Sequence, residues 1–171
     1  MSHPQPSQWP PLDSAGRIVW PNDEAERVQL ARRLFGEAIV GTTDYWIDHA
    51  SDLITNPEPP RPYLHENSAS EQDKVYRKCF ATLSNNNKQV ISHFIYKIVD
   101  GVVVSLLSRL DQFGCAGDRV EISLIGKGPD GEQVEVPVTA VEEEMHQQYH
   151  SWQEEFGKHS ENLTTDLPNL S

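Results

Sequence analysis

Cysteine is scarce in this chain, since only Cys79 and Cys115 occur among 171 residues. They do not form a C-x-x-C pair, so the sequence predicts neither a disulfide framework nor a cysteine zinc site. We expect a reducing, cytoplasmic location on this basis. The sequence also has no phosphate-binding P-loop and no G-x-S-x-G nucleophile motif, so it identifies no catalytic residue.

Long apolar runs are also lacking. The longest, Ile98 to Leu107, is interrupted by Asp100 and is shorter than the roughly 20 residues that a membrane-spanning helix needs. The first 21 residues contain five prolines and no apolar segment of the kind found in secretory signals. We therefore expect neither export nor a membrane partner.

Basic residues are few, with 14 Lys and Arg against 26 Asp and Glu, which gives a net charge of -12. The excess is concentrated in residues 114–171, where 12 acidic and 3 basic residues give a net charge of -9. A negative field repels nucleic acid, whereas it attracts a basic protein or keeps a small protein soluble. We therefore expect no nucleic-acid partner, and a basic protein as the partner if there is one.

The sequence pattern predicts a single globular domain over residues 22–158. A Pro-rich N-terminal arm precedes it over residues 1–21, although Trp9 and Trp20 could dock onto the body, and a frayed C-terminal tail follows over residues 159–171. A helix is expected to begin at Asn22, with a break or kink at Gly41-Thr42-Thr43. That region is expected to form two helices or one that kinks, and a third helix is expected over about 68–83.

An apolar helix is predicted over about 88–113. Because it is apolar on more than one face, we expect it to be the central, buried element. Alternating apolar residues predict an antiparallel β-hairpin over about 119–138, and Thr139 with Glu142 resembles the capping box of a last helix. The predicted fold is α+β, mainly α, with four or five helices packed around the central helix and the hairpin placed before the last helix.

The residues from Gly126 to Gly131 spell G-x-G-x-x-G. A dinucleotide-binding loop needs that string between a strand and a helix. Here it lies between two predicted antiparallel strands, so we interpret it as the turn of the hairpin.

Five glutamates in or near the predicted last helix are the candidate partner-binding residues. They are Glu142, Glu143, Glu144, Glu154 and Glu155. A second acidic row with helical spacing, Asp44, Asp48 and Asp52, would add to the same kind of acidic surface.

An alternative interpretation is a metal site. His146 and His150 are four residues apart, so they would lie on one helical face, and Glu143 with His146 has E-x-x-H spacing. These three residues are the candidate ligands for zinc or iron; in the binding interpretation no cofactor is expected. The metalloprotease pattern is absent, because Gln147 follows His146 where glutamate would be required.

The segment Val90 to Gly114 contains Asp100-Gly101 inside the apolar helix and Leu110-Asp111 near its end. With these features it loosely resembles small acidic bacterial proteins of the immunity and antitoxin kind. The resemblance covers about a seventh of the chain and includes no diagnostic motif. It implies a non-enzymatic inhibitor that neutralises a toxin, and it assigns no binding residue.

Three functions therefore remain open. The first is a non-enzymatic acidic binding protein with a basic partner, such as a toxin. The second is a metal-dependent enzyme that uses the histidine pair. The third is a structural homo-oligomer, a homodimer joined through an apolar helical face.

Overall fold

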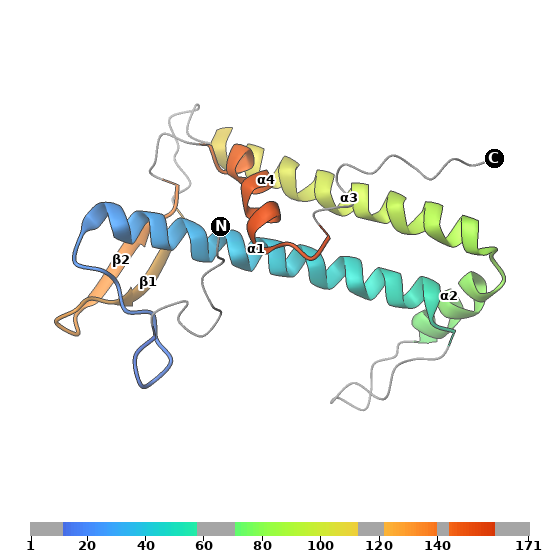
Figure 1. Cartoon of the computed structure of the whole chain (residues 1–171), viewed down its shortest axis with the longest axis horizontal. Helices are drawn as coiled ribbons and strands as arrows, with labels where there is room; N and C mark the ends of the chain where they lie inside the picture. Colours follow the sequence, from blue (N-terminus) through green and yellow to red (C-terminus); the bar gives the residue numbers. More distant parts are fainter. Residues whose placement is uncertain (1–11, 58–70, 113–121, 140–143, 160–171) are drawn as a thin grey trace. The chain divides into compact units, whose positions relative to one another are not determined.

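A computed structural model of the chain describes residues 12–57, 71–112, 122–139 and 144–159 (Figure 1). The chain divides into two compact units. Unit 1 comprises Met1–Ile39 and Leu106–Trp152, and unit 2 comprises Val40–Ser105 and Gln153–Ser171. The prediction of an arm, one domain and a tail stays a prediction.

Four helices and two strands make up the described part of the chain. In chain order they are α1 (Glu24–Thr55), α2 (Glu71–Ala81), α3 (Asn85–Gln112), β1 (Ser123–Lys127), β2 (Gln133–Pro137) and α4 (Met145–Phe156). This order confirms the predicted α+β, mainly α class, with a hairpin before the last helix.

α1 begins one residue later than predicted, because Asp23 rather than Asn22 is its cap. The Asp23 carboxylate accepts a hydrogen bond from the backbone N–H of Glu26 at 3.0 Å. The alternative of two helices divided at Gly41-Thr42-Thr43 is wrong, since α1 is one continuous helix of 32 residues (Figure 1). The alternative of a kink within one helix stays a prediction. Thr43 and Asp44 are buried, so packing holds the helix across residues whose intrinsic helix propensity is low.

Trp20 anchors the segment before α1 to the hairpin in unit 1. Its indole N–H donates to the carbonyl of Val134 at 3.2 Å, and its backbone N–H donates to the carbonyl of Lys127 at 2.8 Å. Trp20 is only 1% exposed, so it belongs to the core of this unit. A Cβ added to Gly126 would lie 2.5 Å from the indole nitrogen, so β1 needs glycine at this position.

The hairpin is antiparallel, with Leu124 opposite Val136 and Ile125 opposite Glu135. Its turn closes through a hydrogen bond from Gly131 N–H to the carbonyl of Gly128 at 3.0 Å, and Gly131 has a φ of 81°. The G-x-G-x-x-G string therefore lies in β1 and this turn, as predicted.

Trp152, from α4, packs on α1 within unit 1. Its ring lies edge-on to Phe35, with centroids 6.1 Å apart. A Cβ added to Gly36 would come within 2.4 Å of the same ring, so glycine is what allows α4 to approach α1 here. The guanidinium of buried Arg32 extends from α1 to the hairpin and donates to the carbonyl of Val138 at 3.0 Å.

In unit 2, Arg77 of α2 closes the C-terminal end of α1. Its guanidinium donates to the carbonyls of Asp52 and Asn56, at 3.1 and 2.8 Å, and to the Asp52 carboxylate at 2.5 Å. The last turn of α1 carries no basic residue of its own. Arg77 therefore supplies the cation that the negative end of the helix dipole favours. It also gives the Asp52 carbonyl a second donor beside the backbone N–H of Asn56, and it satisfies the Asn56 carbonyl just beyond the helix.

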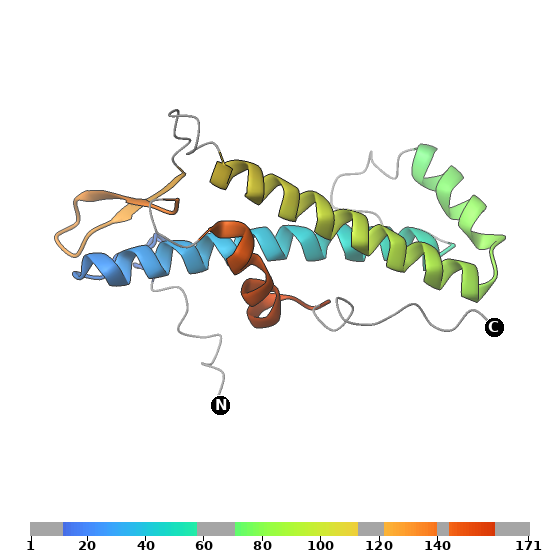
Figure 2. The ribbon, with the colours of Figure 1, turned by 90° about the horizontal axis from the view of Figure 1, so that it is seen from above.

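The expectation that the apolar helix is buried is wrong for much of α3, which is unbroken from Asn85 to Gln112 (Figure 2). Tyr96 and Leu107 are buried, at 4% and 0% exposure. Four other apolar side chains, spaced four residues apart, are exposed: Phe94, Ile98, Val102 and Leu106. The sequence shows that several faces are apolar, but it does not show which of them the rest of the chain covers.

Candidate functional site

The exposed side of α4 carries three of the five predicted partner-binding glutamates. Glu144, just before the helix, and Glu154 and Glu155, near its end, are all exposed. Because an α-helix has about 3.6 residues per turn, Glu144 and Glu155 come to nearly the same side of α4. α4 contains no lysine or arginine, and its basic side chains are the histidines His146 and His150. Glu142 and Glu143 lie outside the described residues.

The hairpin contributes a further set of exposed carboxylates, which are not among the candidate residues predicted from the sequence. They are Asp130, Glu132 and Glu135. Glu135 is opposite the exposed Ile125, so it occupies the outward position of the period-two alternation. That alternation, together with the polar turn, is the sequence signal that could have identified these residues.

Asp111 of α3 is the cap of α4. Its carboxylate accepts the backbone N–H groups of Met145 and His146, each at 3.0 Å, and it lies 2.8 Å from His146 Nδ1. A carboxylate at a helix N-terminus satisfies donors that have no partner within the helix, and it complements the dipole.

The predicted capping box of Thr139 and Glu142 does not start α4, which begins only at Met145. The Thr139 hydroxyl instead accepts a hydrogen bond from the backbone N–H of Ile122 at 3.3 Å, where the chain enters the hairpin. Glu142 lies outside the described residues.

His146 and His150 gain no third ligand within the described part of the chain. No group of three His, Cys, Asp or Glu side chains that could hold a metal ion occurs there. His146 Nδ1 contacts Asp111 at 2.8 Å, and its Nε2 lies 3.4 Å from the Glu144 carboxylate. His150 is exposed, with its ring centroid 6.0 Å from that of Tyr149. Glu143, the third predicted ligand, lies outside the described residues.

The acidic row on α1 does not form the open acidic surface that its spacing suggested, because each carboxylate has a partner in unit 2. The buried Asp44 accepts the backbone N–H of Lys158 at 2.9 Å. Asp48 lies 3.3 Å from Lys158 Nζ and 2.8 Å from His159 Nε2. Asp52 pairs with Arg77. All three carboxylates of this row therefore have partners inside the fold, and two of them, Asp48 and Asp52, are paired with basic side chains.

The pKa values of two of these carboxyls reflect the pairing. Partial burial would raise the pKa of Asp48, but hydrogen bonds and positive charge from His159 and Lys158 outweigh it and hold the pKa below 3.8. At Asp52 burial again raises the pKa. Hydrogen bonds from Arg77 and Asn56, together with the charge of Arg77, lower the pKa by more than burial raises it, so the net shift is downward.

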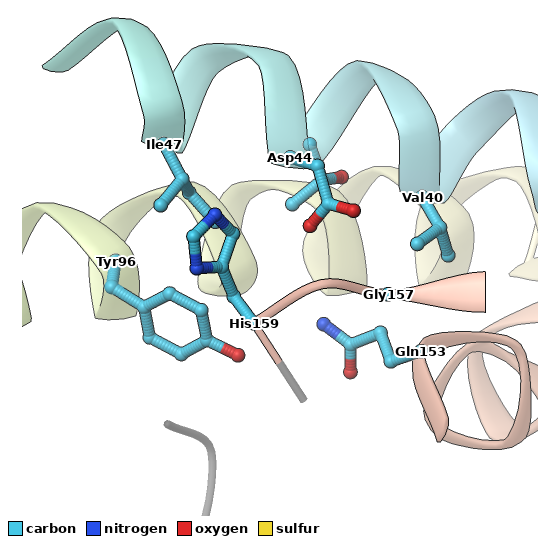
Figure 3. Close-up of a pocket in the computed structure, with 8 residues that line it drawn as sticks. Val40, Asp44, Ile47, Tyr96, Gln153, Gly157 and His159 are labelled. Atoms are coloured by element: carbon cyan, nitrogen blue, oxygen red, sulfur yellow. The ribbon is translucent and has the colours of Figure 1, made fainter. Parts of the chain in front are cut away.

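A small pocket lies among α1, α3 and the end of α4 within unit 2 (Figure 3). The Asp44 carboxylate, the Tyr96 hydroxyl and the Gln153 amide point into it. Its lining residues are Val40, Thr43, Asp44, Ile47, Tyr96, Gln153, Gly157 and His159. The free volume is about 10 Å³, which is room for a single water molecule and too little for a substrate.

α3 overturns the expectation that no segment is long enough to span a membrane. Residues Asn85–Asp111 form a helix of 27 residues. A stretch of 18 residues within it has a mean hydropathy of 1.7, and only 11% of that stretch is buried. Length and composition alone support this, and a single such helix is weak evidence for a membrane span. Asp100, the acidic residue in the middle of this helix, accepts a hydrogen bond from the Gln153 amide at 2.8 Å.

Comparison of the chain with protein-family models, with curated proteins and with solved structures finds no match.

Proposed function

We propose that this protein is a non-enzymatic binding protein whose acidic C-terminal part engages a basic protein. One observation carries the proposal: every described carboxylate side chain between residues 122 and 159 is exposed. These side chains are Asp130, Glu132, Glu135, Glu144, Glu154 and Glu155. The same stretch holds two basic residues, Lys127 and Lys158, and Lys158 is paired with Asp48.

Exposed carboxylates suit a role in association. They attract a basic surface over a distance of about a Debye length, and they suppress encounters with acidic partners. An inhibitor that covers the nucleic-acid-binding face of a toxin would use this chemistry, because such a face must be basic to bind phosphates. Nucleic acid itself should not bind, and the complex should weaken as salt is raised.

The exposed face of α4 is the proposed contact. It combines exposed glutamates with neutral polar residues and has no lysine or arginine. Asp111 also fixes the start of α4, so Glu144 is presented from a capped and ordered helix end. A preorganised surface loses less conformational entropy on binding than a disordered one.

The first experiment is native mass spectrometry on untagged protein isolated gently from its own cells. We expect a complex with one basic protein that dissociates at high salt. Recovery of the bare chain under low salt as well would contradict the proposal.

The second experiment compares two variants of equal charge. One replaces Glu144, Glu154 and Glu155 by Lys, and the other replaces Asp130, Glu132 and Glu135 by Lys. Each changes the net charge by the same amount, so long-range attraction is reduced equally in both. We expect the α4 variant to lose at least about tenfold more affinity than the hairpin variant, because close charge pairs contribute beyond steering. Equal losses would show that net charge matters and that the face of α4 does not.

A further inference from the structure

The exposed apolar row on α3 forms a continuous face with two small residues. Phe94, Ile98, Val102 and Leu106 are 62%, 46%, 62% and 53% exposed. Gly101 and Ser105 are exposed between them, and a Cβ added to Gly101 would meet nothing within 4 Å. We call these six residues the α3 face. Small residues four apart allow a second helix backbone to come close, while the large ones flank the contact.

We propose that two copies of this chain associate through the α3 face, with the two α3 helices antiparallel. This contact is separate from the proposed binding of a basic protein by α4.

Charge favours the antiparallel arrangement. Lys97 and Arg109 are exposed on the borders of the α3 face. In a parallel pair each of them would lie against the same residue of the second copy, so like charges would repel. In an antiparallel pair centred between Gly101 and Val102, Arg109 of one copy lies opposite Phe94 of the other. A guanidinium over an aromatic ring is attractive.

The same register pairs the remaining positions without conflict. Ile98 of one copy lies opposite Ser105 of the other, and Gly101 lies opposite Val102. Lys97 lies opposite Leu106, which its aliphatic stem can cover while its ammonium stays in water. The face is therefore complementary to itself, as a two-fold interface must be.

The size of the face sets the expected strength. At the exposures given above, the four large side chains leave on the order of 350 Å² of apolar surface per copy. Two copies would bury roughly twice that, which is below the roughly 1,200 Å² at which stable interfaces begin and is the size of a weak, transient contact. We expect a reversible dimer with a dissociation constant on the order of 10 µM.

Sedimentation velocity on the full chain tests this over roughly 1 to 300 µM, a range that brackets the expected dissociation constant. The mass should rise from 19.3 kDa toward twice that value. A mass that stays at 19.3 kDa across the range would overturn the proposal.

Ile98→Asp should weaken the dimer at least about tenfold, because it places a charge in the centre of an apolar contact. Ile125→Asp is the matched control, since Ile125 is also an exposed isoleucine, at 59%, but lies on β1. The control should dimerise like the wild type, and far-UV circular dichroism should show both variants folded. Equal dimerisation of the two variants would show that the contact lies elsewhere.

Cysteine crosslinking tests the orientation, in a background with Cys79→Ser and Cys115→Ser. In the antiparallel register, the double variant Ile98→Cys, Ser105→Cys should form a crosslinked dimer, whereas each single variant should not. Crosslinking by the single variants would indicate parallel helices and overturn the register.

Flotation with phosphatidylcholine vesicles tests the competing occupant of the α3 face, a bilayer. Wild-type protein that floats with the vesicles, and an Ile98→Asp variant that does not, would assign the face to lipid and overturn the dimer.

Discussion

Replacing Arg77 by methionine should destabilise the protein more than any change to a surface ion pair. Arg77 is 3% exposed and donates to two backbone carbonyls and one carboxylate at the end of α1. Methionine keeps the apolar stem and the helix propensity, so the variant mainly removes the guanidinium.

The magnitude follows from what the variant leaves behind. Breaking a buried ion pair by removing one partner costs about 3 to 5 kcal/mol. The Asp52 side chain is 22% exposed, so water can solvate part of its charge, and it keeps its hydrogen bond from the Asn56 amide. We therefore expect a loss at the lower end, about 3 kcal/mol in the free energy of unfolding.

Urea denaturation followed by circular dichroism at neutral pH is the assay. A loss of that size lowers the midpoint by about 1.5 M if the slope is about 2 kcal/mol/M. Asp52→Asn and the double variant complete a double-mutant cycle with Arg77→Met. The losses in the free energy of unfolding of the two single variants should not add up in the double variant, because the two residues are in direct contact.

Arg17→Met is the matched control. Arg17 also pairs with an aspartate, Asp13, at 2.7 Å, but its side chain is 53% exposed. Exposed pairs contribute little, so the urea midpoint should not change. If Arg77→Met lowered stability by less than about 1 kcal/mol, or if the control lowered it as much, the cap on α1 would not be the reason for the effect.

Two further predictions concern α1. Gly36→Ala should destabilise the protein by about 1 to 3 kcal/mol, because its Cβ would meet the Trp152 ring. Gly41→Ala should instead stabilise it by about 0.5 to 1 kcal/mol, because its Cβ would meet nothing within 4 Å. Thermal unfolding of both variants checks the pair, and a loss of stability at both sites would contradict the reasoning. The pKa of Asp52 is below its ordinary 3.8 in the folded chain, so its carboxylate stabilises the fold above about pH 4 and that contribution disappears as the pH falls through the lower folded value. Asp52→Asn should therefore lower the urea midpoint at pH 7. The decrease in midpoint from pH 7 to pH 3 should then be smaller in the variant than in the wild type, and an equal decrease in both would refute this.

The sequence predicts the secondary structure of this chain well where local patterns decide it. The alternation around Val134 and Val136 identifies β2, and the glycine string identifies the hairpin turn. In the same way, the long apolar segment identifies α3. These signals depend on apolar residues that recur every 2 or 3.6 positions, and such a spacing is visible within a short stretch of sequence.

The capping contacts at the end of α1 and at the start of α4 could not be predicted, because each depends on residues distant in sequence. Arg77 is 25 residues from Asp52, and Asp111 is 34 residues from Met145. Each looks in the sequence like an ordinary charged residue of a helix. The sequence offered a local cap for α4 in Thr139, and the structure uses that hydroxyl in the hairpin.

The candidate site was predicted in part for the same reason. Exposed glutamates on α4 follow from its pattern of apolar and polar residues, since Met145, Tyr149 and Trp152 are buried. The compensation of the acidic row on α1 did not follow, because Lys158 and His159 reach Asp48 only in the folded chain. Negative charge in a sequence therefore overstates the negative charge that a partner meets.

The boundaries between the two units fall inside helices. α1 passes from unit 1 to unit 2 after Ile39, α3 returns from unit 2 to unit 1 after Ser105, and α4 crosses after Trp152. No single cut in the backbone can release either unit, because each is assembled from two separate stretches of chain. A gene fragment or a proteolysis product that divided the chain at these boundaries would therefore have to interrupt a helix.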